Sequence, residues 1–297
     1  MEKRGSMNAE ITRDVREFYD SIGWQQVSEG LYQNARYEDL RPVSREYIHR
    51  CHMRVKRFLN QTGHLLLDAG SGPIQYPEYL TYSQDYQYRV CVDISIVALQ
   101  EARKRIATHG LFIVADVASL PFKSGIFGGL TSLHTLHHLP LEDQKRAFME
   151  MYRVLMRDCS AVVVNGWTES ILMRRLQWLV VLLEKIGGRV SKKRIDRDEK
   201  LALKSASQIQ SDSLPTGTFV RKFDGSWLHS EIPEEFNLRI YVWRSVSVRF
   251  LRAIIHPVLG GKILLKLLFK LEEKFPLYFG EKGQYPLIIF QKADVNE

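Results

Sequence analysis

Residues 64–73 read His64-Leu-Leu-Leu-Asp68-Ala-Gly70-Ser-Gly72-Pro73. Three apolar residues run into a carboxylate, and a glycine turn follows at once. This order predicts a buried parallel strand whose carboxyl end opens onto a small-molecule site. Gly70 and Gly72 let the backbone bend tightly and approach a ligand closely, because glycine has no Cβ.

Two further strands end in the same way. Tyr88-Arg-Val-Cys-Val-Asp93 places an acid 25 residues after Asp68, and Leu111-Phe-Ile-Val-Ala-Asp116 places another 23 residues later. The first of these acids can accept hydrogen bonds from two ribose hydroxyls. The second can accept one from an exocyclic adenine amine. Because the carboxyl ends of parallel strands share one edge of a sheet, the three acids predict a nucleotide-like ligand there.

The alternation of strands and helices continues along the chain. A fourth short strand is expected at 128–133 and a fifth at 161–165, with a helix over 141–157 between them. This alternation predicts a parallel sheet with right-handed crossovers over 62–167.

These segments resemble the class I methyltransferases that use S-adenosylmethionine (SAM), in the branch typified by ubiquinone and menaquinone biosynthesis. The resemblance implies an α/β fold with a Rossmann-like, seven-stranded, mostly parallel sheet, an antiparallel C-terminal strand pair, an N-terminal helical segment and helical cap insertions. One departure is Pro73-Ile-Gln-Tyr76, where the family usually has another glycine near position 74. The matching segments are Leu67–Gly72, Asp93, Ala115–Asp116 with Leu120–Phe122, Leu136–Pro140 and Met151–Leu155.

The resemblance implies SAM as the cofactor, with the methionine end near Asp68, the ribose at Asp93 and the adenine at Asp116. Plainer interpretations are a helix cap for Asp68 and turn-closing acids for the other two. The expected cofactor-binding residues are Asp68, Ala69, Gly70, Ser71, Gly72, Asp93, Ile94, Asp116, Val117 and Leu133.

Three histidines follow the fourth strand, beside the expected methyl group. They are His134, His137 and His138. Histidine titrates near neutral pH and can act as the base that a hydroxyl or ammonium acceptor needs. We expect His137 or His138 to deprotonate or orient the acceptor. The alternative is that one caps the following helix and the other packs beneath it.

Residues 8–60 read as helices and loops ahead of the first strand. In the resembling family such a segment folds over the cofactor cleft. Tyr19, Tyr32, Tyr37 and Arg41 are therefore candidates for lid or substrate contacts. The alternative for the aromatic side chains is packing against the sheet.

The chain divides into four expected segments. They are an N-terminal helical lid (1–61), a SAM-binding core (62–167), a basic helical cap (168–237) and a C-terminal strand–helix–strand unit (238–297). Within the last two we expect a helix over 170–186, a strand over 238–248, a helix over 257–275 and a strand over 285–292.

Composition sets broad limits on the function. The 297 residues are 45% hydrophobic and 26% charged, as in ordinary globular proteins. Three cysteines favour neither a disulfide framework nor a metal cluster. No N-terminal apolar segment or spanning-length apolar stretch is present, so we expect a cytoplasmic protein.

Positive charge is concentrated in the C-terminal half. The net charge is +8, and residues 171–205 hold ten Lys and Arg against four Asp and Glu. The helix over 257–275 sets Lys262, Lys266, Lys270 and Lys274 beside a leucine-rich side. Such helices predict peripheral contact with the inner, anionic membrane surface. The alternative is a cap whose apolar faces meet each other, with the lysines in water.

The acceptor class can be narrowed by exclusion. The fourth strand lacks an Asn-Pro-Pro-Tyr run, no Pro-Cys nucleophile is present, and no acidic pair stands beside His134. We therefore expect metal-independent transfer to an O, N or C atom of a small molecule, lipid or glycan, with nucleic acid not favoured. Alternatives are an RNA methyltransferase that uses the basic cap and a non-catalytic SAM-binding partner protein. An NAD(P)-dependent oxidoreductase is disfavoured because the turn lacks a third glycine. The oligomeric state stays open.

Overall fold

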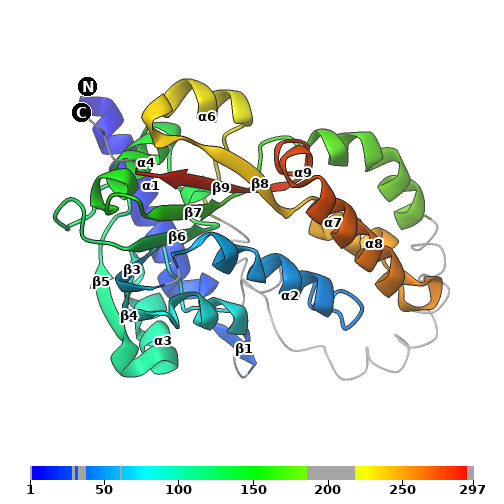
Figure 1. The fold of residues 1–297 in the computed structure, drawn as a ribbon, viewed down its shortest axis with the longest axis horizontal. Coiled ribbons are helices and arrows are strands. Elements are labelled where there is room, and N and C mark those ends of the chain that lie inside the picture. The colour runs from blue at the N-terminus through cyan, green and yellow to red at the C-terminus, as the bar shows by residue number, and fades with distance from the viewer. Residues whose placement is uncertain (1, 29–30, 33–37, 61, 186–217, 293–297) are drawn as a thin grey trace, which may run out of the picture.

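The computed structural model describes residues 2–28, 31–32, 38–60, 62–185 and 218–292. Its centre is a seven-stranded sheet in the order β5-β4-β3-β6-β7-β9-β8 (Figure 1). The strands from β3 to β7 pair in parallel, whereas β9 is antiparallel to both β7 and β8. The expected sheet with its antiparallel C-terminal pair is confirmed. The strands are β3 (Gly63–Ala69), β4 (Tyr86–Asp93), β5 (Gly110–Val114), β6 (Gly129–Leu133), β7 (Ser160–Val164), β8 (Arg239–Arg244) and β9 (Tyr285–Gln291).

Helices cover both faces of this sheet, which is why its strands read as continuous apolar runs. On β7, Ala161 and Val163 pack in the core of one face, and Val162 and Val164 pack in the core of the other. The first face is covered by α4 (Leu141–Val154) and α6 (Gly225–Glu231). The second is covered by α2 (Arg45–Met53), α3 (Ile96–Ile106), α7 (Val248–Ile254) and α8 (Gly261–Lys274).

The N-terminal segment lies against the core. α1 (Glu2–Phe18) continues into a π-helical turn (Tyr19–Gly23), and a two-stranded ribbon of β1 (Gln26–Ser28) and β2 (Leu31–Tyr32) follows. A third, small apolar cluster is formed by Val15, Phe18, Tyr19 and Ile22, with Ile94 packed against it. This contact places the helix over the end of β4.

Several element boundaries differ from the sequence expectation. The strand expected over 238–248 ends at Arg244, because Ser247 accepts a hydrogen bond from Phe250 N (3.1 Å) and caps α7. Asp224 caps α6 in the same way through Trp227 N (2.8 Å). Within the N-terminal helices and loops expected over 8–60, α2 ends at Met53 and a 3-10 turn follows (Val55–Phe58). The helix expected from Pro257 begins at Gly261.

The described residues of the segment expected to form a basic cap fall into two parts. A helix spans residues 171–185. α6 and the turn after it instead pack on the sheet, where Leu228 and Phe236 join the same core as Phe290. Residues 223–236 therefore belong with the core of the fold rather than with a cap over it.

Candidate active site

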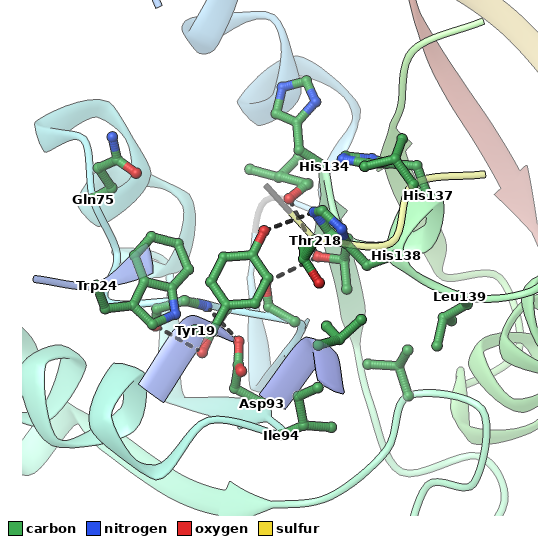
Figure 2. A pocket seen from close by; sticks show the side chains of 18 of the residues that line it. Tyr19, Trp24, Gln75, Asp93, Ile94, His134, His137, His138, Leu139 and Thr218 are labelled. Atoms are coloured by element: carbon green, nitrogen blue, oxygen red, sulfur yellow. Dashed lines mark hydrogen bonds between the residues drawn. The ribbon is translucent and has the colours of Figure 1, made fainter. Parts of the chain in front are cut away.

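A cavity of about 440 Å³ lies at the carboxyl ends of β3, β4 and β6, with α1 along one side (Figure 2). Most of the residues expected to bind the cofactor line it. They are Gly70, Ser71, Gly72, Asp93, Ile94, Asp116, Val117 and Leu133.

The turn after β3 needs backbone conformations that side chains rarely adopt. Gly70 has a φ of 75° and Gly72 a φ of 53°. A Cβ on Gly70 would lie 2.1 Å from Thr135 Cγ2, so only glycine fits there. The turn thus brings bare backbone to the cavity, as the sequence predicted.

The family that the sequence resembles usually has a glycine near position 74. Here Ile74 stands at that position and still adopts a left-handed backbone conformation. Its φ is 55°, a value that is a genuine outlier for a β-branched residue. The side chain is fully buried, and Arg105 Nη1 donates to Ile74 O (2.9 Å) and Gln75 O (3.1 Å). Packing and the arginine therefore hold a loop conformation that glycine would adopt without strain.

Asp93 ends β4 with its carboxylate at the cavity. Oδ2 accepts from Gly72 N and Oδ1 from Ser95 N, both at 2.9 Å. Each carboxylate oxygen keeps a lone pair for a further donor, as contact with ribose hydroxyls requires. Burial raises the pKa of this carboxyl to about 6, although the two backbone hydrogen bonds oppose the rise.

Asp116 follows β5 and lines the same cavity. Its Oδ1 accepts from Ala118 N at 2.8 Å, so the second oxygen is available to an amine donor. Ile94 and Val117 supply apolar surface between the two acids, which suits a flat heteroaromatic ring.

Asp68, which we expected near the methionine end of the cofactor, does not line the cavity, and its carboxylate is bonded within the sheet. Its Oδ2 accepts from Arg89 Nε (3.0 Å) and Nη2 (2.5 Å), and its Oδ1 accepts from Thr131 Oγ1 (3.2 Å). Arg89 comes from the neighbouring strand β4, and both side chains are buried. A buried carboxylate persists only when it is paired, so Asp68 serves the sheet. Ala69, fully buried, also stays outside the cavity.

Gln75 adds a third polar group that fits SAM. Gln75 Nε2 is buried and has no acceptor among the residues that the structure describes. An orphaned amide donor of this kind suits the carboxylate of the methionine end. Asp93 offers acceptors for ribose hydroxyls, Asp116 offers one for an adenine amine, and Gln75 offers a donor for a carboxylate. These three side chains match the polar groups of this cofactor.

The N-terminal segment closes one side of the cavity. Thr12, Val15, Phe18 and Tyr19 line it. The segment is attached through Ser95 Oγ, which donates to Asp20 Oδ1 at 2.5 Å.

Of the other three candidate lid residues, the structure describes the side chain of Arg41 only. Tyr37 and the side chain of Tyr32 fall outside the described part of the chain. Arg41 is directed to α7, because its Nε donates to Asp39 Oδ1 (2.7 Å) and its Nη2 to Leu251 O (2.8 Å). Arg41, a candidate for lid or substrate contacts, therefore joins the N-terminal segment to α7 and does not line the cavity.

The two candidate bases have different surroundings. His138 donates from Nδ1 to Phe219 O (2.9 Å), so its Nε2 accepts from the Tyr19 hydroxyl (2.7 Å; Figure 2). His137 donates from Nδ1 to Asn165 Oδ1 (2.8 Å), and its Nε2 has no hydrogen-bond partner among the described residues. His137 thus keeps a lone pair for an acceptor proton, whereas both nitrogens of His138 are engaged.

All three histidines that line the cavity are held neutral. Burial lowers the pKa of His138 to about 4 and that of His134 to about 3, the latter with help from Arg244. Burial and the neighbouring imidazoles also lower the pKa of His137 well below its usual value. At physiological pH each ring can therefore accept a proton but holds it weakly.

Sequence reasoning missed the polar end of the cavity. Glu38, Arg244, Lys222 and Tyr285 line it, and they come from four separate parts of the chain. Arg244 forms a buried ion pair with Glu38. Lys222 has no carboxylate partner among the described residues, and burial lowers the pKa of its ammonium. Apart from the alternation that placed Arg244 on a strand, no local pattern points to these residues.

The described residues contain no group of three or more His, Cys, Asp or Glu side chains placed to hold a metal ion. No helix among them has both the length and the apolar character required to cross a bilayer.

Comparison with known proteins gives one family match. Residues 67–163 match the family model described as a methyltransferase domain, which covers about a third of the chain. No curated protein sequence gives a significant match.

Solved structures share the whole fold at low sequence identity. Geranyl diphosphate C-methyltransferase from Streptomyces coelicolor A3(2) is 14% identical, with a TM-score of 0.50 over 95% of this chain and 98% of that one. The [4+2]-cyclase SpnF is 16% identical, with a TM-score of 0.50 over 95% and 97%. Phosphoethanolamine N-methyltransferase 1 from Haemonchus contortus is 11% identical, with a TM-score of 0.53 over 99% of this chain and 52% of that one.

The fold and the cavity define an α/β enzyme that binds a nucleotide-like cofactor at the carboxyl edge of its sheet. The match over residues 67–163 identifies this core as a methyltransferase domain, and SAM is the cofactor that the residues lining the cavity fit.

Proposed function

We propose that the protein transfers the methyl group of SAM to an O, N or C atom of a small molecule, lipid or glycan, without a metal ion. The observation that carries this proposal is the imidazole of His137. It lines the cofactor cavity with Nδ1 tied to Asn165 and Nε2 open to an acceptor.

Bound SAM supplies an activated methyl group, so the protein's task is to align the acceptor and keep water out. Alignment of this kind is worth roughly 7–11 kcal/mol of barrier. For a hydroxyl acceptor, His137 Nε2 would take the proton as the oxygen–methyl bond forms and the methyl–sulfur bond breaks. An ammonium acceptor would first lose its proton to Nε2, which frees the nitrogen lone pair for the attack. Asn165 fixes the tautomer and the ring orientation for that step.

The polar end of the cavity supports an acceptor that carries an anionic group. The ammonium of Lys222 lies near enough to lower the pKa values of both His134 and His137. An unpaired, partly buried ammonium is costly unless a ligand compensates for it. We propose that Lys222 binds a carboxylate or phosphate of the acceptor.

The test uses purified protein, SAM with a radioactive methyl group, and separate pools of lipids, polar metabolites, glycans and RNA. We expect label in one of the first three pools, with no effect of a chelator. With a hydroxyl or ammonium acceptor, His137→Gln should lower kcat about 10²–10⁴-fold and leave the Kd for SAM unchanged. Lys222→Met should raise the KM for the acceptor more than it lowers kcat.

Three results would contradict the proposal. Label in RNA alone would favour the nucleic-acid alternative. SAM binding without transfer to any pool would favour a non-catalytic partner protein. Loss of activity in the presence of a chelator would exclude metal-independent transfer.

A further inference from the structure

α8 and the turn before it lie at one end of the molecule (Figure 1). Large apolar side chains are exposed on both and on α9 (Pro276–Lys282), which follows α8. Val258 is 94% exposed, Leu259 77% and Ile263 66%. Exposure of this extent marks an interaction surface rather than ordinary solvent-facing polypeptide. This apolar face consists of Val258, Leu259, Ile263, Leu264, Leu267, Leu271, Phe275, Leu277 and Tyr278.

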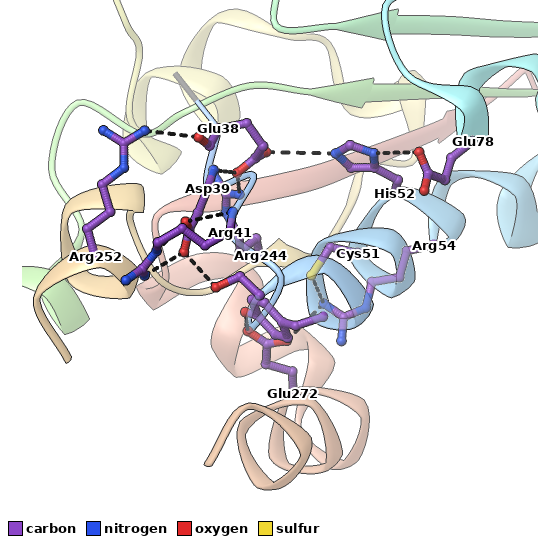
Figure 3. A network of polar contacts seen from close by, with 12 residues as sticks. Glu38, Asp39, Arg41, Cys51, His52, Arg54, Glu78, Arg244, Arg252 and Glu272 are labelled. Atoms are coloured by element: carbon purple, nitrogen blue, oxygen red, sulfur yellow. Dashed lines mark hydrogen bonds and ion pairs between the residues drawn. The ribbon is translucent and has the colours of Figure 1, made fainter. Parts of the chain in front are cut away.

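α8 cannot turn this face inward, because its opposite side is anchored in the core. Leu265 and Phe269 are buried there. Glu272 accepts from the Tyr47 hydroxyl (2.7 Å), Ser245 N (2.9 Å) and Arg54 Nη1 (3.0 Å). Figure 3 shows this buried carboxylate among its partners. The exposed leucines are therefore presented by a rigid helix.

The helix over 171–185 adds apolar surface at the same end. It packs beside α7, since Arg249 Nε donates to Glu184 Oε1 (2.8 Å) and Ser247 N contacts Met173 Sδ (3.3 Å). It exposes Trp178 (65%) and Leu182 (47%), one helical turn apart.

A row of lysines runs along the apolar face. Among the described residues, none of the four forms an ion pair. The acids of the same elements are already engaged: Glu273 with Arg54 and Arg57, and Glu281 with Lys282. The row therefore carries uncompensated positive charge. It consists of Lys262, Lys266, Lys270 and Lys274.

We propose that the apolar face and its lysine row dock on the surface of an anionic lipid bilayer. A helix with leucines on one side and lysines beside them lies in the plane of a bilayer, with the leucines among acyl chains and the ammonium groups at lipid phosphates. The charge complementarity favours a lipid surface over an apolar protein groove. This proposal is independent of the methyl acceptor.

The test is flotation of the full chain with phosphatidylcholine vesicles, with and without a quarter of phosphatidylglycerol. We expect binding to the anionic vesicles at low salt and its loss at high salt. The variant Ile263→Asp/Leu267→Asp should bind at least tenfold more weakly. Lys266→Glu/Lys270→Glu should weaken binding about tenfold or more.

Matched variants on other surfaces act as controls. Met149→Asp places a charge on an exposed position of α4, and Lys104→Glu/Lys123→Glu makes the same change of net charge away from α8. Both should bind like the wild type. The proposal is overturned if wild type ignores anionic vesicles at low salt, or if the controls weaken binding equally. It is also overturned if Ile263→Asp/Leu267→Asp splits a dimer in light scattering while vesicle binding persists, because the face would then join two copies.

Discussion

We expect Asp93 to bind the cofactor ribose and to make cofactor binding depend on pH. Its carboxylate would have to be ionised to accept from Gly72 N, Ser95 N and the ribose hydroxyls at once, and its pKa is raised to about 6. The affinity for SAM should therefore be constant at neutral pH and above, and fall about tenfold per unit as the pH drops below that pKa. Calorimetric titration across this range would measure it.

Two variants act as controls for this prediction. Asp93→Asn should bind SAM more weakly and without the pH dependence. Asp85→Asn changes a more exposed acid just before the same strand and should behave like the wild type. An unchanged Kd for SAM in the wild type one unit below the pKa would show that Asp93 does not contact the cofactor. Without SAM, the raised pKa means that stability falls as pH rises from the ordinary carboxyl value of 3.8 through about 6.

The same residue type thus performs two tasks on adjacent strands. Asp68 and Asp93 each end an apolar strand, yet only Asp93 reaches the cavity. The difference lies in Arg89, whose guanidinium neutralises the charge of Asp68 and donates two hydrogen bonds to its carboxylate. Strand position therefore predicts which edge of the sheet an acid reaches, and a partner on the next strand decides what the acid binds.

At the scale of elements, we propose that the N-terminal segment controls access to the cofactor. Val15, Phe18 and Tyr19 line the cavity, and we expect α1 and the π-helical turn to move when SAM enters. The Ser95 hydroxyl holds the closed position through Asp20. Asp20→Ala should raise the Kd for SAM about five- to tenfold, the equivalent of one hydrogen bond of about 1 kcal/mol.

Hydrogen–deuterium exchange measures this motion. SAM should slow amide exchange over 8–23 in the wild type, and Asp20→Ala should speed it in the free protein. Glu17→Ala changes an exposed acid one turn earlier and should alter neither the Kd nor the exchange. Equal protection of the segment with and without SAM would mean that another element opens the cavity.

At the scale of the whole molecule, one buried polar network joins segments that are far apart in sequence (Figure 3). Glu38 pairs with Arg244 on β8, its carbonyl accepts from Arg252 on α7 (3.0 Å), and His52 on α2 lies beside its carboxylate. Glu38→Gln would leave Arg244 buried without a counter-charge. We expect a loss of about 3–5 kcal/mol in the free energy of unfolding, measured with urea.

The double variant Glu38→Gln/Arg244→Met should lose less stability than Glu38→Gln alone, because it buries no unpaired charge. Glu184→Gln, in an exposed pair with Arg249, should have no measurable effect. An equal loss in the single and double variants would mean that the ion pair does not account for the effect.

The network also gives stability a pH dependence. Burial alone raises the pKa of Glu38, but Arg244 and His52 together lower it below its ordinary value of 4.5. The stabilisation from this pair is therefore present above that pH and is lost as the pH falls. In Glu38→Gln, the free energy of unfolding should therefore depend less on pH below 4.5 than it does in the wild type.

Local sequence predicted the strands, the glycine turn and the acids at Asp93 and Asp116. These features depend on the period of apolar residues and on the few residues that tolerate a tight turn. Both signals lie within short stretches of sequence. The antiparallel strand pair came from the family resemblance, and the structure confirms it.

Residues brought together across the sheet were beyond such local patterns. The Asp68–Arg89 pair joins two strands, and Glu38 meets Arg244 from the opposite end of the chain. Lys222 lines the cavity with the histidines because its neighbours Arg221 and Phe223 are hydrogen-bonded to His137 and Thr168. A side chain's partner depends on which elements pack together. The period of hydrophobic residues predicts that an element is buried, but it does not predict which other element covers it. The chain thus encodes its strands and its cofactor turn locally, whereas long-range packing sets the acceptor end of the cavity and the role of each acid.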